Sequence, residues 1–199
     1  MAYRRTPGVQ ARLSASRERV VVAALELVAA HGYRGCSVGA VAERAGMATG
    51  SVYRHFPGKA DLMAEVFRTA SRREVDAVAR AAALETTAAA RAAAAIETFA
   101  GRARRAPRLA YALLAEPVDP AVEAERLVFR RAYADVFARF IAAGTAAGEL
   151  PPQDAALSAA ALVGAIGEAL VAPLAAGTVP AGTVPSLIAF AHRALGVRP

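Results

Sequence analysis

The sequence predicts an all-α protein of about nine helices. Hydrophobic residues make up 56% of the 199 residues, aromatic residues only 6%, and tryptophan is absent, so alanine supplies much of the apolar content. Alanine has the highest helix propensity and contributes little to a strand face. Prolines and glycines divide the chain into segments of helix length. A chain of this size is expected to form one small module followed by a larger one.

The first helix is expected to begin at Ser14 or Ser16, because either hydroxyl can accept a hydrogen bond from a free backbone N–H at a helix start. Gly32 ends this helix, and Tyr33 just beyond it is expected to pack in the core. Residues 1–13 hold three arginines beside proline and glycine. They are predicted to form a flexible basic arm.

Two short helices separated by a tight turn are predicted within residues 37–59. The first has apolar residues at i, i+3, i+4 and i+7, which form one face of a helix that cannot be stable alone. Gly46 ends it, since glycine takes a left-handed conformation without a Cβ penalty. The second segment, residues 49–55, carries Thr, Gly, Ser, Tyr, Arg and His. This is the layout of a helix-turn-helix whose second helix enters a DNA major groove.

Around this motif the sequence resembles the N-terminal domain of TetR-family transcriptional regulators. The matching residues are Gly32, Tyr33, Ser37, Val38, Val41, Ala42, Ala45, Gly46, Gly50, Val52, Tyr53, His55, Phe56, Lys59 and Leu62. The likeness covers residues 14–70 and implies that they form a DNA-binding domain. It also implies that residues 71–199 form a helical domain that binds an effector and dimerises.

The excess positive charge lies in the segment that carries the motif. Residues 1–73 contain 12 basic and five acidic side chains, whereas the rest of the chain contains 12 of each. A surface that neutralises DNA phosphates is expected to have this distribution. A solvated basic face would carry the same charge, but its coincidence with the helix-turn-helix favours DNA. The arm could follow the DNA backbone or enter the minor groove, or it could make no contact.

The predicted DNA contacts are short or hydrogen-bonding side chains around the second helix of the motif. Thr49 and Ser51 are assigned to bases or phosphates, and Gly50 to a close approach of the backbone to base edges. The resemblance implies phosphate contacts at Tyr53 and His55, whose O–H and N–H groups can donate. The complete predicted set is Ser37, Thr49, Gly50, Ser51, Tyr53, Arg54, His55 and Lys59.

Position within the helices supports or weakens some of these assignments. Lys59 opens a helix, where a cation opposes the helix dipole, so a phosphate partner would explain it better. Ser37 is placed to cap its helix, and its hydroxyl could also meet a phosphate. Ala48 is a poor cap that costs about 1 kcal/mol unless Thr49 takes over, which would shift the start of the recognition helix. Residues 39 and 40 in the first helix of the motif are too small to reach a base, so specificity is expected to depend on the recognition helix and on DNA shape.

The larger domain is predicted to consist of helices separated by proline and glycine. Leu84 and Leu127 are expected on inner faces. Larger side chains among alanines could enclose a cavity for a small apolar effector, although each could also simply pack. The predicted ligand contacts are Phe99, Tyr111, Leu114, Phe129, Tyr133, Phe137 and Ile166. Three polar residues, Arg126, Arg130 and Glu168, could face the cavity or the surface.

Residues 155–176 contain one charged residue and are nearly long enough to span a membrane. Pro173 interrupts them, however, and their apolar content is mostly alanine and glycine. A seam of small residues suits close packing between helices. The prediction is therefore a homodimer through helices near 154–176 and 185–195, without a membrane. Two recognition helices would then stand one DNA turn apart.

Other function classes have weaker support in the sequence. Three histidines and Cys36 do not have the spacing of a metal site, and neither a nucleophile elbow nor a phosphate loop is present, so no enzymatic activity, cofactor or metal is expected. Cys36 fits a reducing cytoplasm, as buried filler or as a redox sensor. The sequence predicts a repressor that a small molecule releases from a palindromic operator. Sequence-independent DNA binding, or a structural helical module without an effector, stays open.

Overall fold

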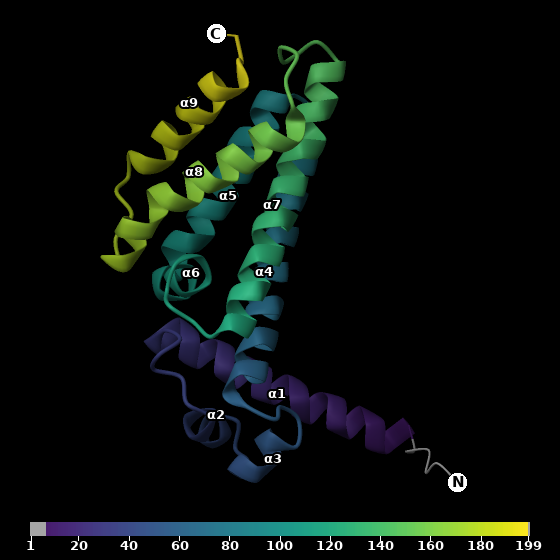
Figure 1. Cartoon of the computed structure of the whole chain (residues 1–199), viewed down its shortest axis with the longest axis vertical. Coiled ribbons are helices and arrows are strands. Elements are labelled where there is room, and N and C mark those ends of the chain that lie inside the picture. Colours follow the sequence, from purple (N-terminus) through teal and green to yellow (C-terminus); the bar gives the residue numbers. More distant parts are fainter. Residues whose placement is uncertain (1–6, 199) are drawn as a thin grey trace.

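This computed structural model describes residues 7–198, which form nine α-helices joined by turns and loops, without strands. The all-α prediction is confirmed. Figure 1 shows a small unit at one end, formed by α1 (Pro7–His31), α2 (Val38–Arg44) and α3 (Thr49–Tyr53). The larger unit contains α4 (Lys59–Ala83), α5 (Ala88–Arg105), α6 (Pro107–Leu114), α7 (Pro120–Ala146), α8 (Ala155–Ala175) and α9 (Thr183–Leu195).

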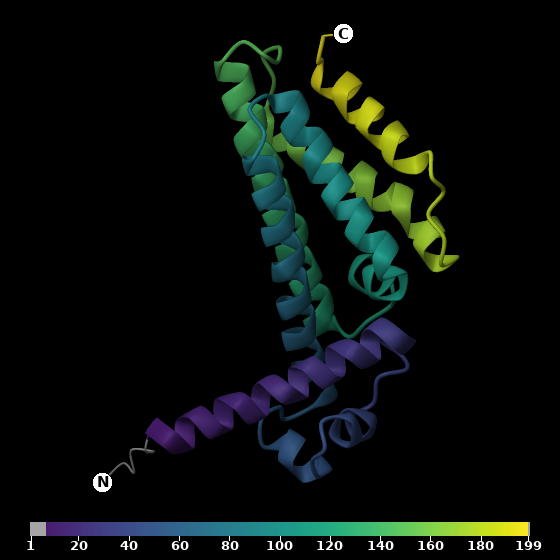
Figure 2. The ribbon, with the colours of Figure 1, turned by 180° about the vertical axis from the view of Figure 1, so that it is seen from behind.

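Two long helices, α4 and α7, connect the ends of the molecule. They lie side by side along its length, and the view from behind in Figure 2 shows α5 next to α4. Helix α4 begins beside the small unit and ends at the far tip, so both units share it. The helices α8 and α9 cover one side of the larger unit, and α6 lies across its lower end, near α1.

A compact apolar core holds the small unit together. Val20, Val41 and Val52 from its three helices are fully buried, and Phe67 of α4 packs among them. Gly46 stands after α2 with φ of +66°, the left-handed conformation that the sequence predicts. Ala48 caps α3 without any side-chain hydrogen bond, so the recognition helix starts with a weak cap.

The predicted start of the first helix is wrong. Helix α1 begins at Pro7, so Ser14 and Ser16 lie inside it and residues 7–13 of the predicted arm are helical. Proline suits a first helical position because its missing N–H would be unpaired there. The residues that follow include alanine, arginine, glutamine and leucine, all good helix formers. Residues 1–6 of the predicted arm lie outside the described residues.

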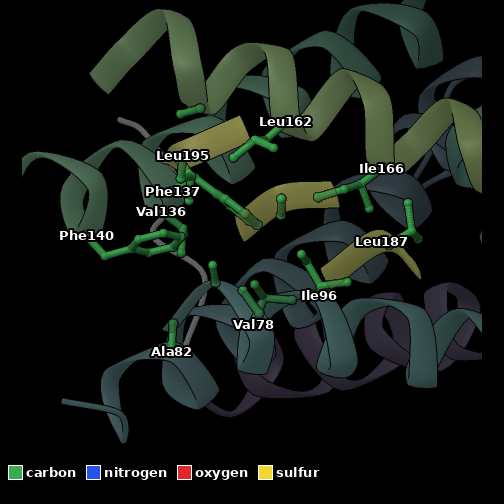
Figure 3. Packing of buried hydrophobic residues seen from close by; sticks show 14 of the residues in the cluster. Val78, Ala82, Ile96, Val136, Phe137, Phe140, Leu162, Ile166, Leu187 and Leu195 are labelled. Carbon is green, nitrogen blue, oxygen red and sulfur yellow. The ribbon is translucent and has the colours of Figure 1, made fainter. Parts of the chain in front are cut away.

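A second apolar core fills the larger unit. Figure 3 shows side chains from α4, α5, α7, α8 and α9 converging, among them Ile96, Phe137 and Ile166. Gly144 of α7 allows a close approach here, since a Cβ at this position would lie 2.6 Å from the Cβ of Ala88. The predicted cap Ser37 accepts a hydrogen bond from the first turn of α2, and Asp154 accepts two from the first turn of α8.

Two leucines predicted to face inward are exposed instead. Leu84 follows the last residue of α4 at the α4–α5 turn and is 84% exposed. Leu127 is 58% exposed, because it stands outside the stripe of buried α7 residues spaced three or four apart. Periodicity within one helix does not show which neighbours will cover its faces.

Candidate DNA-binding surface and ligand cavity

Four of the predicted DNA contacts, Thr49, Gly50, Ser51 and Tyr53, lie on α3, at the end of the molecule farthest from the C-terminus (Figure 1). Thr49, Gly50 and Arg54 are exposed, and Tyr53 is 50% exposed although it is a large aromatic residue. The Arg54 guanidinium donates to Ser51 Oγ over 2.9 Å. These side chains therefore form one polar surface that projects from the short helix α3.

Nothing among residues 7–198 explains why position 50 on this surface is glycine. A Cβ built on Gly50 would meet none of their atoms within 4 Å, and its φ is not in the left-handed region. Within these residues, neither packing nor backbone conformation therefore requires glycine. The close approach of a molecule outside the chain would explain it.

Two other predicted contacts are held by partners within the protein. The Nε2 of His55 lies 3.0 Å from Ser16 Oγ, which ties the end of α3 to α1. The Lys59 ammonium donates to the Tyr33 carbonyl over 3.4 Å and lies 4.7 Å from the centre of the Tyr33 ring. Lys59 thus has a structural reason for its position at the start of α4, and the dipole argument for a phosphate partner loses force.

Cys36 is fully buried in the core of the small unit. Burial raises the pKa of its thiol to about 11, so the reactive thiolate is disfavoured. Of the two sequence interpretations, this environment fits the buried filler.

A cavity of about 600 Å³ lies between α4, α5, α6, α7 and α8. Six of the seven predicted ligand contacts line it, namely Phe99, Leu114, Phe129, Tyr133, Phe137 and Ile166. Tyr111 does not line the cavity and packs against the larger core from α6. The volume falls within the range of small-molecule sites, about 300–1,000 Å³.

One wall of the cavity carries a polar group that the sequence did not predict. Arg102 Nε donates to Glu74 Oε2 over 2.5 Å, and its Nη2 donates to Oε1 over 2.8 Å. Tyr133 packs edge-on against Phe99, with ring centres 5.4 Å apart. Burial raises the pKa of Tyr133, and the nearby Glu74 charge adds to this, so the phenol stays neutral. Arg102 and Glu74 lie on different helices, and no pattern along the chain relates them.

The α6–α7 loop is bonded to the small unit through Tyr33. Glu116 Oε2 accepts a hydrogen bond from the Tyr33 backbone N–H over 2.8 Å, and Asp119 accepts one from the Tyr33 hydroxyl. The Tyr33 ring also packs edge-on against Phe67 of α4, with ring centres 6.1 Å apart. Glu116, Asp119 and Tyr33 are called the loop clamp below.

Arg126 supports this loop from inside. The residue is 8% exposed, and its guanidinium donates to the backbone carbonyls of Ala112, Leu113 and Glu116 over 2.7–3.1 Å. Glu123 neutralises its charge. Arg126 also lines the cavity, so the cavity wall and the loop clamp share the backbone at the end of α6.

Comparisons with known proteins agree with this architecture. The family profile described as "Bacterial regulatory proteins, tetR family" matches residues 20–66. The comparison with curated proteins returns no match.

Three solved structures share the fold of nearly the whole chain. FadR from Bacillus subtilis in complex with stearoyl-CoA has a TM-score of 0.73 at 19% identity, covering 90% of this chain and 95% of that one. Reduced NemR from E. coli has a TM-score of 0.76 at 12% identity, covering 92% and 98%. A TetR-family regulator from Agrobacterium tumefaciens has a TM-score of 0.74 at 19% identity, covering 91% and 98%.

The matched segment contains the C-terminal half of α1, all of α2 and α3, and the beginning of α4, which is the unit that presents the predicted DNA contacts. Residues 20–66 accordingly belong to the N-terminal domain of the TetR family of bacterial regulatory proteins, and nearly the whole chain shares the fold of the solved structures.

Proposed function

We propose that the protein is a homodimeric, cytoplasmic repressor that binds a palindromic operator and is released by a small, largely apolar molecule. The cavity carries this proposal, since it is large, lined mainly by apolar side chains, and shares backbone with the loop clamp on the DNA-binding unit. The stearoyl-CoA bound to the FadR structure is a ligand with a long apolar chain, which supports the same class here.

The polar surface on α3 would contact the operator. Thr49 and Ser51 are proposed for bases or phosphates, Gly50 for close approach, and Tyr53 for a phosphate oxygen. The other proposed contacts are Ser37, Arg54, His55 and Lys59.

An exposed apolar face on α8 supports the dimer. By length and composition α8 is the one helix within residues 7–198 that could cross a membrane, and only 22% of its most apolar window is buried. Leu157, Ala161 and Ala172 lie on one exposed face of it, where Glu168 is the single charged residue, and Phe190 of α9 is 40% exposed. A second copy packed on α8 and α9 would cover this surface and place two α3 helices for two half-sites.

The loop clamp would connect the cavity to the DNA-binding unit. A ligand that moves the end of α6 would displace the carbonyls held by Arg126, and with them Glu116 and Asp119. Tyr33 would then move relative to α4 and change the spacing of the two recognition helices. Energetic coupling between two sites is reciprocal, so operator binding must also act on the loop.

Tyr33→Phe tests this coupling, because it removes the hydrogen bond to Asp119 and keeps the aromatic ring. In the unchanged protein, bound operator DNA is expected to slow amide hydrogen exchange in residues 116–119. In Tyr33→Phe this protection should fall by about tenfold, since a hydrogen bond to a charged group contributes about 1.5–3 kcal/mol. Tyr111→Phe, on α6 but outside the clamp, should keep the full protection. Equal protection in all three proteins would exclude the clamp as the route.

The operator hypothesis is tested with DNA from the region flanking the protein's own gene. Affinity is measured at two salt concentrations for that DNA, a scrambled duplex of equal length, and one half-site. A preference of about a thousandfold for the full site, lost with the half-site, is expected of a specific dimer. Equal and strongly salt-dependent binding to all duplexes would show sequence-independent binding instead.

A further inference from the structure

We propose that the cavity takes an amphipathic anion, with its apolar body among α4–α8 and its acidic head at Arg130 and Arg131. This deepens the proposed function and rests on it. Four basic and two acidic side chains lie around the cavity, which is more charge than an apolar ligand needs. They are Arg102, Arg126, Arg130, Arg131, Glu74 and Glu168.

Two of the four arginines already have partners in the protein. Arg102 forms a two-point ion pair with Glu74, so this pair adds no net charge to the cavity wall. Arg126 is neutralised by Glu123 and occupied by three backbone carbonyls. Neither guanidinium is available to a ligand without breaking buried bonds.

The other two arginines are available. Arg130 and Arg131 are exposed, and within residues 7–198 no carboxylate lies within ion-pair distance of either. Glu168 of α8, also exposed, is the one acid on the cavity lining that is not engaged by Arg102. The accessible part of the lining therefore carries two positive charges against one negative charge.

The order of residues along α7 separates the head from the apolar body. Arg126, Arg130, Tyr133 and Phe137 follow one another at spacings of three or four and share a face of the helix. Burial lowers the pKa of Arg126, and repulsion from Arg130 adds to this, which agrees with the closeness of the two side chains. The basic end of this row, Arg126 and Arg130, lies toward α6. The aromatic end leads into the apolar core, where Figure 3 shows Phe137.

This arrangement distinguishes between ligand classes. A neutral apolar ligand would gain nothing from Arg130 and Arg131, and a cation would be repelled by both. A carboxylate or phosphate can accept hydrogen bonds from a guanidinium at two points. An anionic head would also lie one helical turn from Arg126, next to the backbone that carries the loop clamp.

Three amphiphiles whose chains contain twelve carbons test the charge preference: dodecanoate, dodecanol and dodecyltrimethylammonium. Binding to the full-length protein is measured by calorimetry below micelle-forming concentrations. Dodecanoate is expected to bind at least about tenfold more tightly than dodecanol, and the ammonium most weakly; a tenfold ratio corresponds to about 1.4 kcal/mol.

Charge variants show where the head binds. Arg130→Gln and Arg131→Gln should each reduce the ratio of dodecanoate to dodecanol affinity several-fold, and Glu168→Gln should raise it. Arg139→Gln, an exposed arginine on α7 outside the cavity lining, should leave the ratio unchanged. Dodecanol affinity should be similar in all four variants, which shows that each cavity is intact.

Different failures have different meanings. If dodecanol or the ammonium binds as tightly as dodecanoate, or if the preference for the anion survives in both arginine variants, the anionic head at this position is wrong while the apolar cavity stands. If none of the three amphiphiles binds, the proposed apolar effector fails as well, and with it this inference.

Discussion

Phe67→Ala is expected to lower the free energy of unfolding by about 3–5 kcal/mol. The Phe67 side chain is 1% exposed and packs with the core residues of α1, α2 and α3 from its place on α4. It also supports the Tyr33 ring. Removing it leaves a cavity where the small unit joins the larger one, and a loss of this size is a large part of the total stability of a typical domain, about 5–15 kcal/mol.

The measurement is the urea midpoint of the purified variant at fixed protein concentration, followed by far-ultraviolet circular dichroism. Leu84→Ala is the matched control, because Leu84 directly follows the other end of the same helix and is 84% exposed. It should shift stability by no more than about 0.5 kcal/mol. A Phe67→Ala midpoint close to that of Leu84→Ala would mean that the two units do not depend on this packing.

Gly50→Leu is expected to abolish most operator binding while the protein stays as stable as before. In the described part of the chain nothing lies within 4 Å of a Cβ built on Gly50, so the added side chain projects outward from α3. A side chain forced into a packed interface costs about 1–3 kcal/mol, which corresponds to a loss of affinity of about 5–150-fold. Leucine is also a better helix former than glycine, so the melting temperature should hold or rise.

Affinity for the operator is measured by fluorescence anisotropy, and stability by calorimetry on the same samples. Gly50→Ala should give a smaller loss than Gly50→Leu, because the loss grows with side-chain volume. Gly101→Ala, on α5 with only the end of the Arg105 side chain 4.0 Å away, should leave affinity unchanged. Undiminished affinity in Gly50→Leu would place the DNA elsewhere than on α3.

The small unit could be predicted closely because its signals are local. The signals for α2 lie within a few residues of one another. They are the Ser37 cap at its start, the apolar spacing within it, and Gly46 after its end, and each indicates one local structure. The start of α1 was missed because a serine that could cap a helix also fits within one. Ser16 is used inside the helix, where its hydroxyl meets His55.

The cavity could be predicted by residue type but not by its polar contacts. Large side chains among alanines indicate a cavity, and six of the seven named residues line one. The pairing of Glu74 with Arg102, however, depends on how two helices cross. Likewise, Tyr33 and Asp119 are 86 residues apart and meet only because α6 and α7 return to the small unit. Leu84 and Leu127 show the same limit for burial.

Arg126 has a consequence for how the region near the cavity can move. A helix usually frays first at its C-terminal end, where backbone carbonyls lack partners within the helix. Two such carbonyls of α6, those of Ala112 and Leu113, and the carbonyl of Glu116 just beyond it are held at once by the planar guanidinium of Arg126 from the following helix. Partial melting of α6 would strand a buried charge. The corner between α6 and α7 is therefore expected to shift as one rigid piece, so that ligand size is transmitted to the DNA-binding unit as displacement and not absorbed as disorder.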